Sequence, residues 1–347
     1  MSDSRTFAPA RRRLALLAAW LGLAAGARAD DQRFVFEKAE MAVPFRITLY
    51  APDADAARLA AEAAFRRVET LNSILSDYDP DSELSRLGQS SGQGKTVKVS
   101  TPLWRVIERS QIIAEQSAGA FDVTVGPLVN LWRRMRRQAE LPTPELLAEM
   151  RGRVGWRNLR LLPETQSVEL LKPDMRLDVG GIAKGFAADE AIAVLKSRGL
   201  PRALVAASGD IVAGDPPPGE PGWKVAIEGL AVGDPPAAQE VILLANRGVS
   251  TSGDAYQFVE IGGVRYSHII DPRTGIGLTG RSLVTVVAPD GLTADGLDTA
   301  IDILGNERGL ELLAKWPGTS VRMQRLVGGK VETVRSAEWP KSRGPRR

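Results

Sequence analysis

The sequence LDVGGIAKGFAADE, Leu177 to Glu190, predicts a strand that passes through two adjacent glycines into a helix. The strand is expected near 175–179, and the helix from about Ile182 to Ser197. Adjacent glycines let a ligand approach the backbone closely, and the N-terminus of a helix offers free N–H groups. Lys184 adds a positive charge in the first turn, so the stretch predicts an anion site. A simple strand-to-helix turn with an exposed lysine is the equally weighted alternative, and the spacing is not that of a Walker A loop.

Apolar periodicity on both sides of this stretch predicts an α+β chain rather than a regular alternation of strands and helices. The expected helices cover about 53–75, 82–87, 101–117, 123–137, 144–151, 182–197, 292–304 and 307–315. Two strands are expected within 33–50, and others near 158–162, 167–171, 175–179, 203–207, 223–228, 240–245, 257–261, 264–270, 282–288, 320–326 and 331–335.

The chain of 347 residues contains one histidine and no cysteine. Disulfides, thiolate nucleophiles, Fe–S clusters and sites built from several histidines are therefore excluded. The formal net charge of +3 comes from the ends of the chain, because residues 1–29 hold five Arg and one Asp and leave 40 basic against 41 acidic side chains beyond them. This balance argues against nucleic acid as a partner.

The first 29 residues predict a signal peptide. Arg11–Arg13 form a basic start, Leu14–Ala25 is an apolar run, and Ala27-Arg28-Ala29 matches an A-x-A cleavage site. The run is shorter than the roughly 20 residues that span a bilayer, although an uncleaved anchor or a buried helix remains the alternative. We therefore expect a periplasmic protein without a membrane anchor, with one domain over 30–340 and a basic tail over 341–347.

A second motif, LTADGLDTAIDIL at 292–304, places a carboxylate and a hydroxyl on one face of a helix. Asp295 and Thr299 are four residues apart, and Asp298 is three residues from Asp295. Such oxygens can bind a hard cation such as Mg²⁺ beside phosphate oxygens. A capped helix with acidic residues in its first turn is the competing interpretation.

The only histidine lies in YSHIIDPRTG, residues 266–275. His268, Asp271 and Arg273 are close enough in sequence to serve proton transfer and phosphate binding. A structural histidine followed by an ordinary turn is the alternative. Upstream, LSDYDPDSELSRL imitates a calcium loop but lacks the Gly and Glu that such a loop needs, so we interpret it as an acidic turn that presents Tyr78 to an aromatic ligand.

Taken together and in this order, the motifs resemble the ApbE family of FAD:protein FMN transferases. The resemblance runs from about Met41 to Gly305 and rests on YDPDSELSRL, GAFDVTVGPLVNLW, LDVGGIAKGFAADE, STSGDAYQFVEIGGVRYSHIIDPRTG and TADGLDTA. The chain has Met41-Ala42-Val43 where the family usually has Met-Gly-Thr, and Ser208-Gly209-Asp210 where Gly-Gly-Asp is common.

The resemblance implies a T-fold-related α+β architecture of mixed sheets and packed helices, with FAD in a cleft between two lobes. It also implies transfer of the FMN part of FAD to a Thr or Ser hydroxyl of an acceptor protein, with Mg²⁺ or Mn²⁺ required and AMP released. The residues expected to hold FAD are Met41, Tyr78, Ala120, Phe121, Asp122, Asp178, Lys184 and Ile269. The metal site is expected at Gly181 and Asp298 through their carbonyls, Asp295 and Thr299. By the same resemblance His268 is the base, assisted by Asp271.

Two other functions stay open on the sequence. With water as the acceptor, the same site would make the protein an FAD pyrophosphatase that yields FMN and AMP. A non-catalytic periplasmic flavin-binding protein is the other alternative. Because the chain contains no acceptor motif of the family's kind, the expected partner of a transferase is another protein with an FMN-binding domain, such as a subunit of a membrane respiratory complex.

Overall fold

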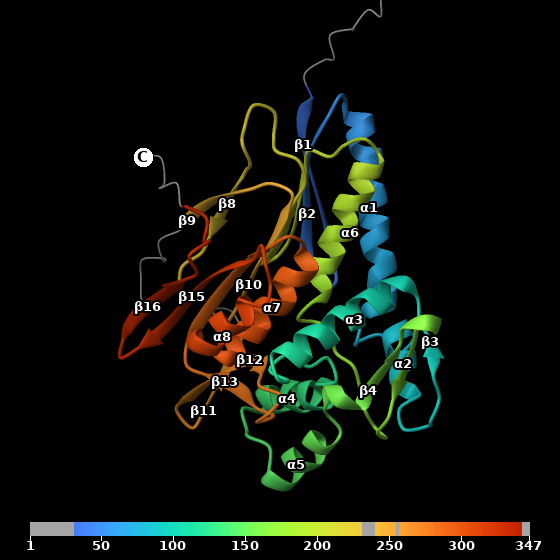
Figure 1. The fold of residues 1–347 in the computed structure, drawn as a ribbon, viewed down its shortest axis with the longest axis vertical. Coiled ribbons are helices and arrows are strands. Elements are labelled where there is room, and N and C mark those ends of the chain that lie inside the picture. Colours follow the sequence, from blue (N-terminus) through green and yellow to red (C-terminus); the bar gives the residue numbers. More distant parts are fainter. Residues whose placement is uncertain (1–30, 231–239, 255–256, 342–347) are drawn as a thin grey trace, which may run out of the picture.

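The computed structural model describes residues 31–230, 240–254 and 257–341, so the predicted signal peptide and most of the basic tail lie outside the described residues. An antiparallel sheet of eight strands forms its centre (Figure 1). In spatial order the strands are β1 (Gln32–Glu40), β2 (Val43–Ala51), β6 (Ala203–Ala207), β7 (Asp210–Ala213), β10 (Arg247–Gly253), β14 (Ser282–Ala288), β15 (Ser320–Val327) and β16 (Lys330–Arg335). The first and the last strand of the described chain thus form the two opposite edges of this sheet.

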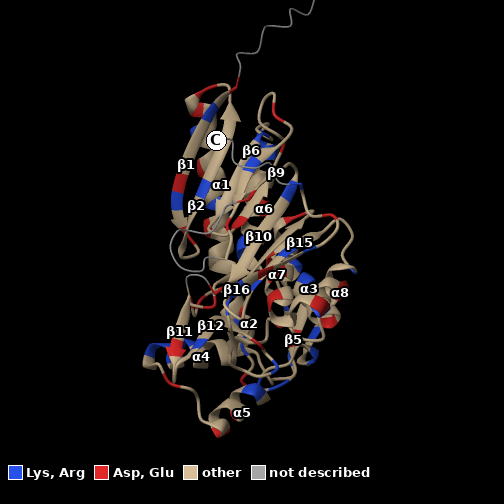
Figure 2. Cartoon of the chain, turned by 90° about the vertical axis from the view of Figure 1, so that its left-hand side faces the viewer, with Lys and Arg blue, Asp and Glu red and all other residues tan. Residues whose placement is uncertain are grey.

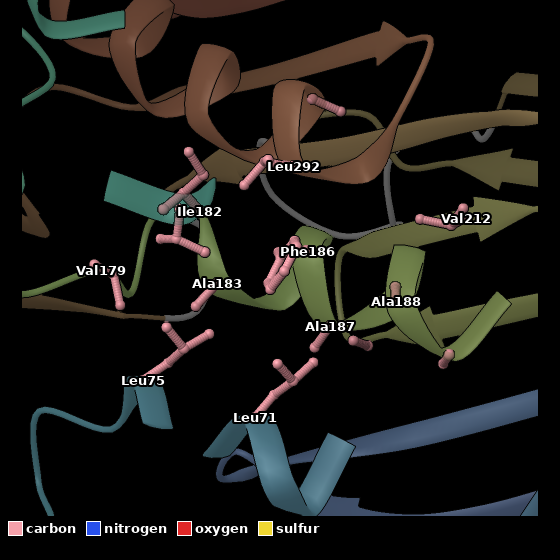
Figure 3. Packing of buried hydrophobic residues seen from close by; sticks show 14 of the residues in the cluster. Leu71, Leu75, Val179, Ile182, Ala183, Phe186, Ala187, Ala188, Val212 and Leu292 are labelled. Carbon is pink, nitrogen blue, oxygen red and sulfur yellow. The ribbon is translucent and has the colours of Figure 1, made fainter. Parts of the chain in front are cut away.

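Three helices, α1 (Ala54–Leu75), α6 (Ala183–Ser197) and α7 (Gly291–Leu304), pack with this sheet around the main core. The side chain of Asp53 caps α1 by accepting a hydrogen bond from the Ala56 N–H at 2.8 Å. Small buried residues let α1 and α6 pack closely, and Figure 3 shows Leu71 of α1 beside Ala187 of α6. The same packing fixes the first turn of α6, which carries Lys184.

The α6 and α7 helices meet at two glycines. A Cβ atom on Gly185 would lie 2.1 Å from the carbonyl oxygen of Gly291, and one on Gly291 would lie 2.5 Å from the carbonyl oxygen of Gly185. Only residues without a side chain permit this approach. In the contact, the Gly185 N–H donates to the carboxylate of Asp295 at 2.9 Å, which ties the two helices together.

The turn between β1 and β2 has a left-handed backbone. Met41 and Ala42 have φ of 49° and 61°, as a two-residue hairpin of type I′ requires. Ser208, in the turn between β6 and β7, has φ of 58°. Ala42 and Ser208 are the positions where the family usually has glycine, and glycine adopts this conformation without a Cβ clash.

A second, smaller core lies at the lower end of the molecule in Figure 1. It is formed by α4 (Gly126–Gln138), α5 (Pro144–Gly152) and a three-stranded sheet of β11 (Phe258–Ile261), β12 (Val264–Ile270) and β13 (Gly277–Thr279). Trp132 of α4 lies at its centre, with its ring 5.7 Å from that of Tyr266 in an edge-on arrangement.

The remaining elements complete the surface. The hairpin of β8 (Trp223–Ile227) and β9 (Glu240–Leu244) has its own apolar cluster with residues of the main sheet. The others are α2 (Glu83–Gln89), α3 (Thr101–Gln116), α8 (Asn306–Leu313) and a sheet of β3 (Val97–Lys98), β5 (Ser167–Leu170) and β4 (Leu159–Leu162). Basic and acidic residues are interspersed on the side shown in Figure 2. Among the described residues, no helix has both the length and the apolar character needed to cross a bilayer.

The α+β class and all eight predicted helices are confirmed, but the strand predicted at 175–179 is wrong. Only an isolated parallel bridge between Val125 and Arg176 forms there. The Asp178 N–H donates to the carbonyl of Val123, and the backbone then turns as the Gly180 N–H donates to the Asp178 carboxylate. The prediction also missed β3, β7, β10 and β13.

Candidate active site

A cavity of about 670 Å³ gathers thirteen of the fourteen predicted site residues. Its walls come from the β1–β2 turn, α4, the segment before α6, β7, β10, β12 and α7. Residues from both the main core and the smaller core line it, which agrees with the expected cleft between two lobes. The predicted residues in its wall are Met41, Tyr78, Ala120, Phe121, Asp122, Asp178, Gly181, Lys184, His268, Ile269, Asp295, Asp298 and Thr299.

Three buried carboxylates form one cluster in this cavity. Asp210 from β7 and Asp295 and Asp298 from α7 each offer an oxygen, and these oxygens all lie within 4.8 Å of one another. Burial first, and then the neighbouring carboxylates, raise the pKa values of Asp295 and Asp298 above the ordinary range. A divalent cation would relieve this repulsion, and buried carboxylate oxygens suit Mg²⁺.

Other oxygens complete the cluster. The hydroxyl of Ser250 in β10 lies within hydrogen-bond distance of the carboxylates of both Asp210 and Asp298, and its one proton can be donated to either. Gly181 lies against Thr299, because a Cβ on Gly181 would be 3.2 Å from the Thr299 hydroxyl. The predicted metal residues are therefore together, and they are joined by Asp210 and Ser250, for which no role was predicted from the sequence. For Asp210 the available signal was its place in the family's Gly-Gly-Asp motif.

Lys184 is an ion-paired residue of the cavity wall rather than an exposed helix residue. Its ammonium group pairs with Asp210 and lies 3.9 Å from Asp295. Burial disfavours the charged form, but Asp210 and Asp295 outweigh this effect and raise the pKa of Lys184. Lys184 therefore stays charged beside the carboxylate cluster.

Arg133 of α4 organises another part of the wall. Its guanidinium pairs with Asp77, lies 3.2 Å from the carboxylate of Asp178, and stands 4.3 Å from the ring centroid of Tyr78. Tyr78 is 74% exposed, so its ring stays available to stack on a ligand. Burial, and then the charge of Asp77, raise the pKa of Asp178.

The side chain of Asp122 is occupied by the protein itself. One carboxylate oxygen accepts hydrogen bonds from the N–H and hydroxyl of Thr124, and the other accepts from the Trp156 N–H at 2.8 Å. Burial raises its pKa. Asp122 therefore fixes the shape of the segment that places Ala120 and Phe121 in the cavity wall.

His268 extends from β12 and has a half-buried ring. Its Nδ1 lies 3.2 Å from the carbonyl oxygen of Gln257, an atom that only accepts, so Nδ1 carries the proton and Nε2 holds the free lone pair. The neighbouring backbone is held in place because Trp132 Nε1 donates to the carbonyl of Ser267 at 2.9 Å. Burial, together with the positive charges of Arg136 and Lys184, lowers the pKa of His268 to about 4. At neutral pH this histidine is therefore uncharged and able to accept a proton.

Asp271 is the one predicted site residue that the structure does not bring into the cavity. Its carboxylate accepts two hydrogen bonds from the Arg273 guanidinium, at 2.8 and 2.7 Å, and a third from the Arg273 N–H. The pair closes the turn after β12. Among the described residues, no hydrogen bond joins Asp271 to His268.

Comparison with known proteins gives one consistent result. The profile of the ApbE family matches residues 41–323. The chain is 31% identical to the FAD:protein FMN transferase of Escherichia coli K12 over 88% of both chains, and 35% identical to that of Haemophilus influenzae over 72% of this chain and 73% of the relative. The structure of the flavin transferase ApbE from Vibrio cholerae superposes with a TM-score of 0.81 at 30% identity, covering 89% of this chain and 98% of that one.

Proposed function

The chain belongs to the ApbE family, and from this premise we propose that it transfers the FMN part of FAD to a Thr or Ser hydroxyl of an acceptor protein and releases AMP. The observation that supports the proposal most strongly is that one cavity contains both the buried carboxylate cluster and His268, whose Nε2 holds a free lone pair. A phosphoryl-type transfer needs both features, because charge must be neutralised and the attacking hydroxyl must lose its proton.

In this reaction the hydroxyl oxygen of the acceptor forms a bond to the flavin-side phosphorus. The bond from that phosphorus to the bridging oxygen breaks, and AMP departs with the electron pair. His268 Nε2 takes the hydroxyl proton, a contribution typically worth about 10²–10⁴-fold in rate. Trp132 keeps the backbone beside the base in place, and the cavity walls orient the two reactants.

We assign the metal site to the cluster of Asp210, Asp295 and Asp298, with Gly181 and Thr299 beside it. Mg²⁺ bound there would neutralise charge on the pyrophosphate and help AMP to depart. Lys184 stays charged and ion-paired, and it adds positive potential at the N-terminus of α6.

The same proposal places the reaction in the periplasm, because residues 1–29 have the pattern of a signal peptide. The acceptor is then a protein whose FMN-binding domain faces that compartment, such as a subunit of a membrane respiratory complex.

The test combines the purified protein, FAD, Mg²⁺ and an FMN-acceptor domain. We expect flavin fluorescence on the acceptor in a denaturing gel. We expect no such fluorescence when the reaction is run in the presence of EDTA. FMN and AMP in the supernatant with no fluorescent acceptor would mean hydrolysis instead, and intact bound FAD would mean a flavin-binding protein.

A variant of the base separates binding from turnover in this assay. His268→Ala should keep its affinity for FAD and lose transfer, because the ring contributes the proton acceptor. If binding and turnover fell together, His268 would be a ligand or a structural residue rather than the base.

A further inference from the structure

The cations in the cavity wall differ in how well they are neutralised. Arg133 is paired with Asp77 and Asp178, and Lys184 with Asp210 and, more distantly, Asp295. Arg136 also lines the cavity, one helical turn beyond Arg133 on α4. In the described part of the chain, no carboxylate lies within ion-pair distance of its guanidinium.

The Arg136 side chain is half-buried, and its Nε atom is fully buried without a hydrogen-bond partner. Burial lowers its pKa, but arginine remains protonated at neutral pH. Because no carboxylate among the described residues pairs with it, the accessible part of this side chain can bind an anion that enters the cavity.

The position of Arg136 indicates where that anion lies. Arg136, Lys184 and His268 line the same cavity, and the positive charges of Arg136 and Lys184 both lower the pKa of His268. The base therefore has a cation of α4 and a cation of α6 in its surroundings. In the proposed reaction, the group beside the base is the phosphate that the acceptor hydroxyl attacks, since the hydroxyl must touch both.

We infer that Arg136 binds a non-bridging oxygen of the flavin-side phosphate and stabilises its charge during transfer. The inference rests on the proposed function. Arg136 forms no covalent bond and moves no proton; the proton goes to His268 and the leaving electron pair to AMP, as described above. The planar fork of a guanidinium suits two phosphate oxygens at once.

A binding experiment tests the inference without relying on transfer. FMN and riboflavin differ only in the phosphate, so the ratio of their dissociation constants reports contacts to that group. Arg136→Gln should weaken FMN binding roughly 10-fold to 100-fold, as expected for a lost charge-assisted hydrogen bond, and should leave riboflavin binding within about twofold. Arg137→Gln is the matched control, because Arg137 is exposed on the same helix and should change neither constant. Equal losses for FMN and riboflavin, or no loss for FMN in a folded Arg136→Gln protein, would overturn the inference.

Kinetics then distinguish the phosphate from a carboxylate of the acceptor. Arg136→Gln should lower kcat by about 10²–10³-fold with the KM for the acceptor unchanged, since the removed donor acts on developing charge. The kcat of Arg136→Lys should lie between those of Arg136→Gln and the parent protein, because lysine keeps the positive charge but lacks the planar guanidinium. A change confined to the KM for the acceptor would assign Arg136 to the acceptor and overturn the phosphate contact. If the parent protein itself transferred no FMN, the proposed function would fail while the FMN and riboflavin comparison still reported on Arg136.

Discussion

The contact between α6 and α7 makes Gly185→Ala a demanding test of the site. The new methyl group would lie 2.1 Å from the Gly291 carbonyl oxygen, so the helices must separate by about 1.3 Å to reach an ordinary contact of 3.4 Å. Overpacking against backbone costs about 3 kcal/mol, and the better helix propensity of alanine returns about 1 kcal/mol. We expect the free energy of unfolding to fall by about 2 kcal/mol. Because Gly185 also donates to Asp295, the same shift should lower the transfer rate about 100-fold.

Urea unfolding followed by circular dichroism measures the first effect, and the flavin transfer assay measures the second. Gly88→Ala is the matched control, since a Cβ there would meet nothing closer than 4.0 Å and Gly88 lies in α2, away from the cavity. The control should be neutral or stabilising by up to about 1 kcal/mol. A Gly185→Ala protein as stable and as active as the parent would refute the argument that the close approach of the two helices positions the carboxylate cluster.

Four further predictions follow from single features of the structure. Ala42→Gly should raise the free energy of unfolding by about 0.5–1 kcal/mol in a urea titration, because φ is 61° there; a loss would show that the turn is not strained. Asp295→Asn should weaken Mn²⁺ binding at least about 10-fold by electron paramagnetic resonance while the fold persists, and unchanged affinity would remove Asp295 from the metal site. The one histidine should give a single NMR titration with a midpoint near pH 4. Because this pKa lies below the ordinary value of 6.5, the contribution of His268 to the free energy of unfolding is complete above pH 6.5 and is lost as the pH falls toward 4. A midpoint near pH 6.5 would contradict the burial of the ring. Trp132→Phe should lower kcat more than the affinity for FAD, because it removes the hydrogen bond to Ser267 next to the base, and equal losses in both would mean a purely structural role.

Much of the fold followed from local patterns in the sequence. Helices such as α1 have both a capping residue and a regular apolar face, so their limits were predicted closely. By contrast, β10 has the sequence RGVSTSG, whose Ser and Gly residues are typical of a turn. It forms a strand because β7 and β14 pair with it on either side, and these partners are distant in sequence. The strand predicted at 175–179 was wrong for the converse reason. Its apolar residues are buried, but no neighbouring strand of the described chain pairs with them.

Most residues of the cavity could be predicted because they occur in the family motifs. The hydrogen bonds and ion pairs among these residues could not be predicted. Nothing in the sequence indicated that the carboxylate of Asp122 would accept hydrogen bonds from Thr124 and Trp156. Nor did it indicate that Asp271 would pair with Arg273. Arg136 belongs to a basic run that resembles a solvated helix face. Only the tertiary structure reveals that Arg133 and Arg136 are the members of that run that line the cavity.

The two walls of the cavity rest on separate apolar cores. The carboxylates of α7 stand on the main core, whereas His268 extends from a strand whose neighbours Tyr266 and Ile270 belong to the smaller one. A substitution inside the smaller core can therefore change the shape of the wall around His268 while the carboxylate cluster on the other side remains supported by the main core. The architecture thus divides the cavity wall into two parts whose supporting cores can accept substitutions independently of each other.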